Sequence, residues 1–173
     1  QKNHNNTTIL EADIREVKDD VFRKYKNIDV IIAGPPCQGF SMCGKRDIKD
    51  KRNTLFEELL RAVKIIDPKI VVIENVVGLI SMKTPDGDNV KEVIETKLRE
   101  MGYGVESKIL DSSDYSVPQS RKRIIFIASK IGKIGFPKSK GHKVTVRDAL
   151  SNLPDVDSKN YLLPANEFQE TMA

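Results

Sequence analysis

Hydrophobic residues along the chain alternate between short continuous runs and runs with helical spacing. Continuous apolar runs at residues 28–33, 70–73 and 123–128 predict buried strands, and residues 103–110 also have the composition of a strand. Segments of helical length separate most of these runs. The pattern therefore favours an α/β fold built on a parallel sheet.

Two of the intervening segments place their apolar residues on one helical face. In residues 54–66 the shared positions are Leu55, Leu59, Ala62, Val63 and Ile66, with Asn53 as a candidate cap and Asp67-Pro68 as the stop. In residues 88–101 they are Val90, Val93, Ile94, Leu98 and Met101, and Gly102 ends the helix. Residues 131–173 are less periodic and predict one short helix at 146–150.

Composition adds few constraints. The chain has 173 residues, 39% of them hydrophobic and 31% charged, which fits a globular domain with a core. A net charge of +4 is compatible with a polyanionic partner without requiring one. We expect no membrane partner, because no apolar run approaches the length of a span and residues 1–8 lack the apolar core of a signal peptide. A first residue other than Met suggests that the chain starts inside a longer protein.

The two cysteines, Cys37 and Cys43, form neither a disulfide framework nor a zinc cluster, so we expect a reduced compartment and no metal. Cys37 directly follows the strand at 28–33, where parallel sheets carry functional groups. Its loop, Pro-Pro-Cys-Gln-Gly-Phe-Ser at residues 35–41, is followed by cations that favour a thiolate. A buried structural cysteine is the plainer interpretation, but two preceding prolines favour a nucleophile. Cys43 has no such surroundings and is interpreted as incidental.

Two further polar clusters accompany strands. Glu74 follows the run at 70–73, where burial would favour a protonated carboxyl or one bonded to a donor, suited to protonating a ring nitrogen. A capping or salt-bridged glutamate is the alternative. Gln119, Arg121 and Arg123 alternate in an extended segment and could face one side, where guanidinium groups suit a phosphate or a base edge. A solvated edge strand is the alternative there. Asp13 follows a short run at residues 7–10.

In this order, the clusters resemble the motifs of the DNA cytosine-5 methyltransferase family. The family's Pro-Cys-Gln-Gly-Phe-Ser matches residues 36–41, its Glu-Asn-Val matches 74–76, and its Gln-x-Arg-x-Arg matches 119–123. Asp13-Ile14 is similar to the segment that contacts the adenine of S-adenosylmethionine, and residues 145–154 to the stretch that leads into target recognition. The resemblance runs from about Ile9 to Pro154. It implies a Rossmann-like S-adenosylmethionine-dependent methyltransferase fold with a mostly parallel sheet.

The resemblance also implies roles. Cys37 would add to carbon 6 of a cytosine flipped out of double-stranded DNA, Glu74 would neutralise ring nitrogen 3, and Arg121 would hold the base and orient Glu74. The cofactor, S-adenosylmethionine, would be bound by Asp13, Ile14 and Pro36. DNA contacts are expected from Gln38, Ser41, Arg52 and Arg123, with the basic loop at 45–52 closing over phosphates.

Three parts of the family pattern are not found in the sequence. The Phe-x-Gly-x-Gly cofactor loop and the ribose-binding glutamate have no match, and a target-recognition domain is also missing. Residues 1–130 are therefore expected to form a partial catalytic domain, incomplete at its N-terminal strands. Residues 131–173 would be a connector towards the missing recognition region. A complementing chain is an expected partner, and this chain alone is expected to bind the cofactor weakly, not to turn over, and to expose the edge of strand 28–33.

Three functions remain open. The first is methylation of cytosine in DNA within a bacterial restriction-modification system, in the cytoplasm at the nucleoid. The second is cytosine-5 methylation of RNA, against which Gly39-Phe40-Ser41 weighs. The third is a non-catalytic DNA-binding or complementing subunit, which the missing cofactor loop favours and the set of Cys37, Glu74 and Arg121 disfavours.

Overall fold

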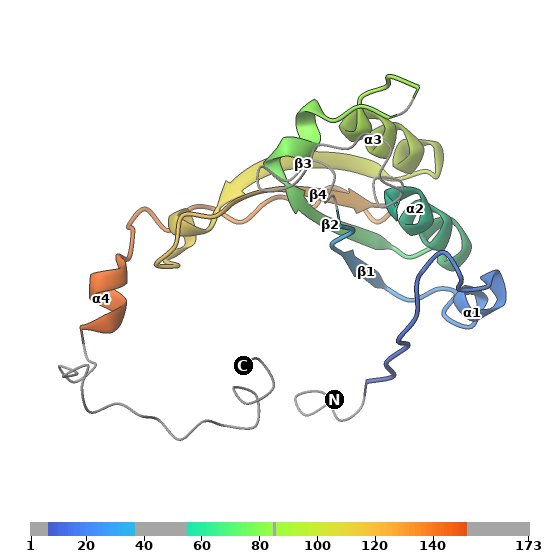
Figure 1. The fold of residues 1–173 in the computed structure, drawn as a ribbon, viewed down its shortest axis with the longest axis horizontal. Helices are drawn as coiled ribbons and strands as arrows, with labels where there is room; N and C mark the ends of the chain where they lie inside the picture. Colours follow the sequence, from blue (N-terminus) through green and yellow to red (C-terminus); the bar gives the residue numbers. More distant parts are fainter. Residues whose placement is uncertain (1–6, 37–54, 85, 152–173) are drawn as a thin grey trace, which may run out of the picture.

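A computed structural model describes residues 7–36, 55–84 and 86–151, as one sheet with its longer helices on one side (Figure 1). Figure 1 also places the last helix apart from the body of the sheet. The elements follow in the order α1 (Asp19–Arg23), β1 (Val30–Ala33), α2 (Leu55–Ile66), β2 (Ile70–Val76), η3 (Val77–Ser81), α3 (Val90–Glu100), β3 (Gly104–Asp111), η4 (Ser112–Tyr115), β4 (Lys122–Ser129) and α4 (Val146–Leu150).

The sheet has the strand order β1-β2-β4-β3. β1 pairs with β2 in parallel, with Val30 opposite Ile70, whereas β4 is antiparallel to both of its neighbours. Three strands thus run in one direction and β4 runs against them. The α/β class is confirmed, and the reversal of β4 is an addition to the sequence-based expectation. A connection through η4 is too short for the crossover that parallel strands need, so β4 returns antiparallel to β3.

One face of the sheet forms the core. The buried residues of β2 and β4 on this face pack against α2 and α3: Val71, Ile73, Ile124, Phe126 and Ala128 meet Phe56, Leu59, Leu60, Val63, Ile94 and Leu98. The predicted inward face of α2 is confirmed at Leu59, Ala62, Val63 and Ile66, while Leu55 is only partly buried. The helix ends at Ile66 as expected, with Asp67 at a φ of 56°.

The second long helix begins at Val90, two residues later than predicted, and has Val90, Ile94 and Leu98 of the predicted face buried, with Val93 and Met101 partly buried. Asn89 caps α3 by accepting a hydrogen bond from the Glu92 amide, and Gly102, with a φ of 87°, follows its end. The short helix α4 begins with a capping box between Thr145 and Asp148. Three short elements, α1, η3 and η4, were not predicted, and residues 7–10 do not form a strand.

The other face of the sheet is open at β1. Ile32 is 79% exposed, and β1 is an edge strand among the described residues, which agrees with the expected free edge. Farther across the face, the segment after β4 runs back along the sheet (Figure 1). Ile134 lines one cavity together with Ile127, and Pro137 lines another together with Ile125. We call residues 131–145 the connector.

Candidate active site on the open face of the sheet

Glu74 lies within β2, not beyond its end as the sequence suggested. The strand extends to Val76 because β4 supplies a partner for each residue, with Glu74 opposite Ile125 and Val76 opposite Arg123. Alternation along the strand turns Glu74 to the open face. Its side chain is 43% exposed, so the expected burial of the carboxyl is wrong.

Two arginines of the β4 segment face the Glu74 carboxylate. Arg123 Nε lies 2.8 Å from Glu74 Oε1, and Arg121 Nη2 lies 4.0 Å from the same oxygen. The family resemblance implied that Arg121 orients Glu74, whereas Arg123 is the nearer of the two arginines in the structure. Arg123 also donates to the Lys122 carbonyl at 2.8 Å, which fixes its guanidinium. The carboxylate is thus held by a charged donor.

A cavity of about 290 Å³ opens beside this group. Its charged or polar lining residues are Glu74, Arg121, Arg123, Ser112 and Tyr115, and its apolar ones are Leu110, Ile125 and Pro137. Gln119, which was expected to share this side, precedes β4 and does not line the cavity. Apolar walls with a carboxylate and two guanidinium groups can hold a planar, polar heterocycle.

Asp111 joins the two ends of the segment between β3 and β4, which includes Arg121. The Asp111 carboxylate accepts hydrogen bonds from Ser113 N at 3.0 Å, Ser120 Oγ at 2.9 Å and Arg121 N at 3.2 Å. These donors, the Ser113 amide first, lower the pKa of Asp111. Ser112 Oγ adds a bond of 2.6 Å to the Gln119 carbonyl. The run Asp-Ser-Ser-Asp after a strand, typical of side chains that bond to nearby backbone, is the signal that sequence reasoning passed over.

The backbone that leads into Cys37 lies against the same strand. Asn75, which is 4% exposed, donates from Nδ2 to the Pro35 carbonyl at 3.0 Å. A Cβ added to Gly34 would lie 3.6 Å from Glu74 Oε2. Glu74 therefore presents one oxygen to Arg123 and the other towards Gly34. Cys37, Gln38, Ser41 and Arg52 lie outside the described residues.

On the other side of Gly34 is an apolar cavity of about 240 Å³. It is lined by Ile14, Ala33, Gly34, Pro35, Pro36, Leu55 and Leu59, so the structure brings the predicted cofactor residues Ile14 and Pro36 together. Asp13, the residue before Ile14, is bonded by the Arg15 side chain and amide, which lower its pKa to about 2. Asp13 is not among the residues that line this cavity, whose apolar walls suit the flat face of a heterocycle.

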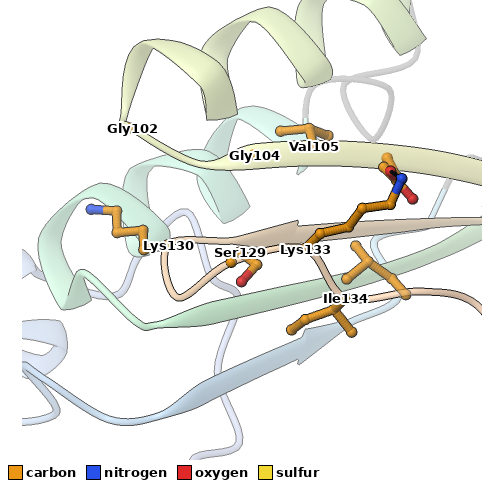
Figure 2. Close-up of a pocket in the computed structure, with 10 residues that line it drawn as sticks. Gly102, Gly104, Val105, Ser129, Lys130, Lys133 and Ile134 are labelled. Atoms are coloured by element: carbon orange, nitrogen blue, oxygen red, sulfur yellow. Dashed lines mark ion pairs between the residues drawn. The ribbon is translucent and has the colours of Figure 1, made fainter.

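The largest of these cavities, about 490 Å³, is at the opposite end of β4 (Figure 2). Its two lysines are engaged by carboxylates, Lys133 with Glu106 at 2.8 Å and Lys130 with Asp67. Figure 2 shows these two lysine side chains pointing apart. Two lysines that are already paired with carboxylates and point apart do not form an anion-binding site. The size of this cavity is therefore no argument that it is the active site.

Two further searches cover the described residues only. They include no group of three or more His, Cys, Asp or Glu side chains that could hold a metal ion. Within the same ranges, no helix is both long and apolar enough to cross a membrane.

Comparison with known proteins agrees with the motifs. The family model described as C-5 cytosine-specific DNA methylase matches residues 1–171. Type II methyltransferase M.DdeI of Desulfomicrobium norvegicum is 39% identical over 98% of this chain and 45% of its own length. Type II methyltransferase M.HhaI of Haemophilus parahaemolyticus is 34% identical over 93% of this chain and 50% of its own length. The chain thus spans about half the length of these curated relatives.

Solved structures share the fold. A protein described as a DNA modification methyltransferase encoded within an E. coli prophage superposes with a TM-score of 0.67 at 29% identity, covering 85% of this chain and 42% of that one. A mutant of Spodoptera frugiperda DNMT2 gives a TM-score of 0.59 at 27% identity, covering 83% and 42%. With a family model that spans nearly every residue, this chain belongs to the C-5 cytosine-specific DNA methylase family.

Proposed function

We propose that the protein transfers a methyl group to carbon 5 of cytosine in double-stranded DNA, within a bacterial restriction-modification system. The observation that carries the proposal is the position of Glu74, which is fixed by Arg123 and directed at the backbone that enters the Cys37 loop. Relatives named as Type II methyltransferases support the same reaction class. The protein would then act in the cytoplasm, at nucleoid DNA.

The cofactor S-adenosylmethionine supplies the methyl group. In the proposed reaction the Cys37 thiolate adds to carbon 6 of the flipped cytosine, and the electron pair of the ring double bond becomes available at carbon 5. Glu74, a carboxylate paired with Arg123 in this structure, would take up a proton from solvent as the base enters, share it with nitrogen 3 to stabilise the charge that develops on the ring, and take it back when the ring double bond is restored. After carbon 5 has gained the methyl group, loss of its proton to a base restores the double bond and expels the thiolate.

The two cavities support this arrangement because Gly34, which lines the apolar cavity, lies next to Glu74, which lines the other. Gly34 lines the apolar cavity with Ile14 and Pro36, and its open Cα faces Glu74 Oε2. Cofactor binding by Asp13, Ile14 and Pro36 would therefore place the methyl donor next to the ring that Glu74 and Arg121 hold. Gln38, Ser41, Arg52 and Arg123 are proposed to contact DNA, the first three from the loop after Cys37.

A trapping experiment tests the proposal. Duplex DNA that contains 5-fluorocytosine, incubated with this chain, S-adenosylmethionine and a complementing fragment that carries the cofactor loop and the recognition domain, is expected to form a covalent complex, because carbon-bound fluorine, unlike hydrogen, cannot be removed by a base and the thiolate stays attached. Cys37→Ser is expected to abolish the complex, and Cys43→Ser is the matched control that retains it. No complex in the wild type, or a complex in Cys37→Ser, would reject the proposed mechanism. Mass spectrometry that detects 5-methylcytosine in treated DNA and in treated transfer RNA distinguishes the proposed function from methylation of RNA.

The partner proposal concerns the edge of the sheet. We propose that a complementing polypeptide supplies the cofactor loop and the recognition domain and covers the exposed residues of β1, Val30 and Ile32. An exposed apolar edge strand is a template for pairing with another chain. Methylation is expected only when such a fragment is added, and robust turnover by residues 1–173 alone would refute the idea and leave the catalytic proposal intact. Residues 131–173 would lead towards the same recognition domain.

A further inference from the structure

One side chain of α2 contacts the N-terminal segment at several points. Arg61 Nη2 donates to the backbone carbonyls of Ile14 at 3.0 Å and Val17 at 3.1 Å, and Nη1 donates to Asp19 Oδ1 at 2.5 Å. Its Nε bonds Glu58 Oε2 of the same helix at 2.7 Å. All three nitrogens of one planar guanidinium therefore donate hydrogen bonds. A lysine, with a single nitrogen, could not make the same set of contacts.

The segment that Arg61 holds has little regular structure of its own. Residues 14–16 form turns, the preceding residues are irregular, and α1 has only five residues. Local backbone bonds are limited to turns such as Glu16 N to the Asp13 carbonyl at 2.9 Å. The ring of Phe22 lies 5.1 Å from the Arg61 guanidinium carbon and adds a cation–π contact from α1.

The contacts of Arg61 continue into the apolar cavity. Ile14 accepts the Arg61 bond on its carbonyl and lines the cavity, as do Leu55 and Leu59 from the helix that carries Arg61. The Arg61 side chain is 31% exposed and makes no direct contribution to that lining. Arg61 therefore holds a residue that lines the cavity without lining the cavity itself.

We propose that Arg61 is a positioning residue for the cofactor: it holds the Ile14 and Val17 carbonyls against α2, and so sets the place of the neighbouring Asp13 and the shape of the apolar cavity proposed to take adenine. This inference rests on the proposed function for the identity of the ligand. Arg61 touches neither substrate in this role. Its loss would leave the segment tied only by local turns, and the cavity would have to be ordered each time S-adenosylmethionine binds.

Hydrogen exchange of the protein as it stands gives the first test. Arg61→Lys, which keeps the charge but cannot reach four acceptors, is expected to speed amide exchange at residues 13–19 by about ten-fold, and Arg61→Gln by more. Arg23→Gln is the matched control, because Arg23 pairs with Asp19 and Asp20 but makes no contact with the two carbonyls. Unchanged exchange in Arg61→Lys would overturn the positioning role whatever the protein catalyses.

Kinetics of the form that methylates DNA give the second test. Arg61→Lys is expected to raise the KM for S-adenosylmethionine by about ten-fold while kcat and the KM for DNA stay within about two-fold. A fall in kcat with an unchanged KM for S-adenosylmethionine would show a merely structural role and overturn the inference. If the wild type neither binds S-adenosylmethionine nor methylates, the proposed function fails and the cofactor role of Arg61 fails with it, while the exchange result still reports whether Arg61 orders the segment.

Discussion

The two faces of the sheet do different work with alternate residues of the same strands. On the covered face, Ile73 of β2 and Phe126 of β4 are 1% and 0% exposed and pack under the helices. On the open face, the adjacent residues Glu74 and Ile125 line a cavity with Arg123. Because successive residues of a strand point to opposite faces, neighbouring residues here contribute to the core on one face and to the candidate active site on the other.

The difference shows why a charged group can occupy a central strand here. Glu74 on the covered face would be buried among apolar side chains without a partner, at a large cost. On the open face it is part solvated and bonded to Arg123. Substitutions on the two faces are therefore expected to separate into losses of stability and losses of turnover.

The largest expected effect is on the covered face. Phe126→Ala removes a fully buried ring at the centre of the core and is expected to lower the free energy of unfolding by about 3–5 kcal/mol. Urea denaturation followed by circular dichroism measures the loss. If the free energy of unfolding fell by less than about 1 kcal/mol, the covered face would not be the main core of the protein.

Next comes Glu74→Gln on the open face. The amide keeps the shape of the side chain but cannot deliver a proton, so kcat is expected to fall by at least about 100-fold, with a stability change below about 1 kcal/mol. Single-turnover methylation measures the first quantity and urea denaturation the second. Glu106→Gln, which loses the pair with Lys133 at the far end of the face, is the control and should leave kcat unchanged. Equal loss of turnover in both variants would contradict a specific role for Glu74.

The smallest effect tests a polar group on the covered side. Tyr103, 3% exposed, donates to the Pro68 carbonyl at 2.6 Å, and Tyr103→Phe is expected to cost about 1 kcal/mol in stability without changing kcat. Burial raises the pKa of Tyr103 to about 12 from its ordinary value of 10.0.

The pH dependence of this variant has a definite sign. Because the folded-state pKa is the higher one, the contribution of the neutral hydroxyl is complete below about pH 10 and is lost as the pH rises towards about 12. The gap in unfolding free energy between wild type and Tyr103→Phe should therefore narrow across this window. Urea denaturation at about pH 9 and about pH 11 measures it, and a gap that widens would contradict the assignment.

Local patterns predicted the helices well, because burial at helical spacing and the stops at Asp67 and Gly102 are properties of short segments. The direction of β4 and the length of β2 were not predictable from either strand alone, since each depends on its partner. Without knowledge of the pairing between β2 and β4, Glu74 was placed beyond the end of its strand and Arg121, not Arg123, was expected to be its partner. The contacts of Arg61 join residues more than forty positions apart, and no periodic pattern marks them.

The path of the connector has a mechanical consequence. Pro137 forms part of the wall beside Glu74, and its carbonyl accepts a bond from Tyr115 Oη at 3.2 Å. Two residues later the connector is tied again, by Ser139 Oγ and Lys140 N to the Asp114 carbonyl at 3.1 and 3.0 Å. A pull on the chain beyond Lys140 would therefore act first on η4 through Asp114, next to Tyr115, which lines the cavity beside Glu74.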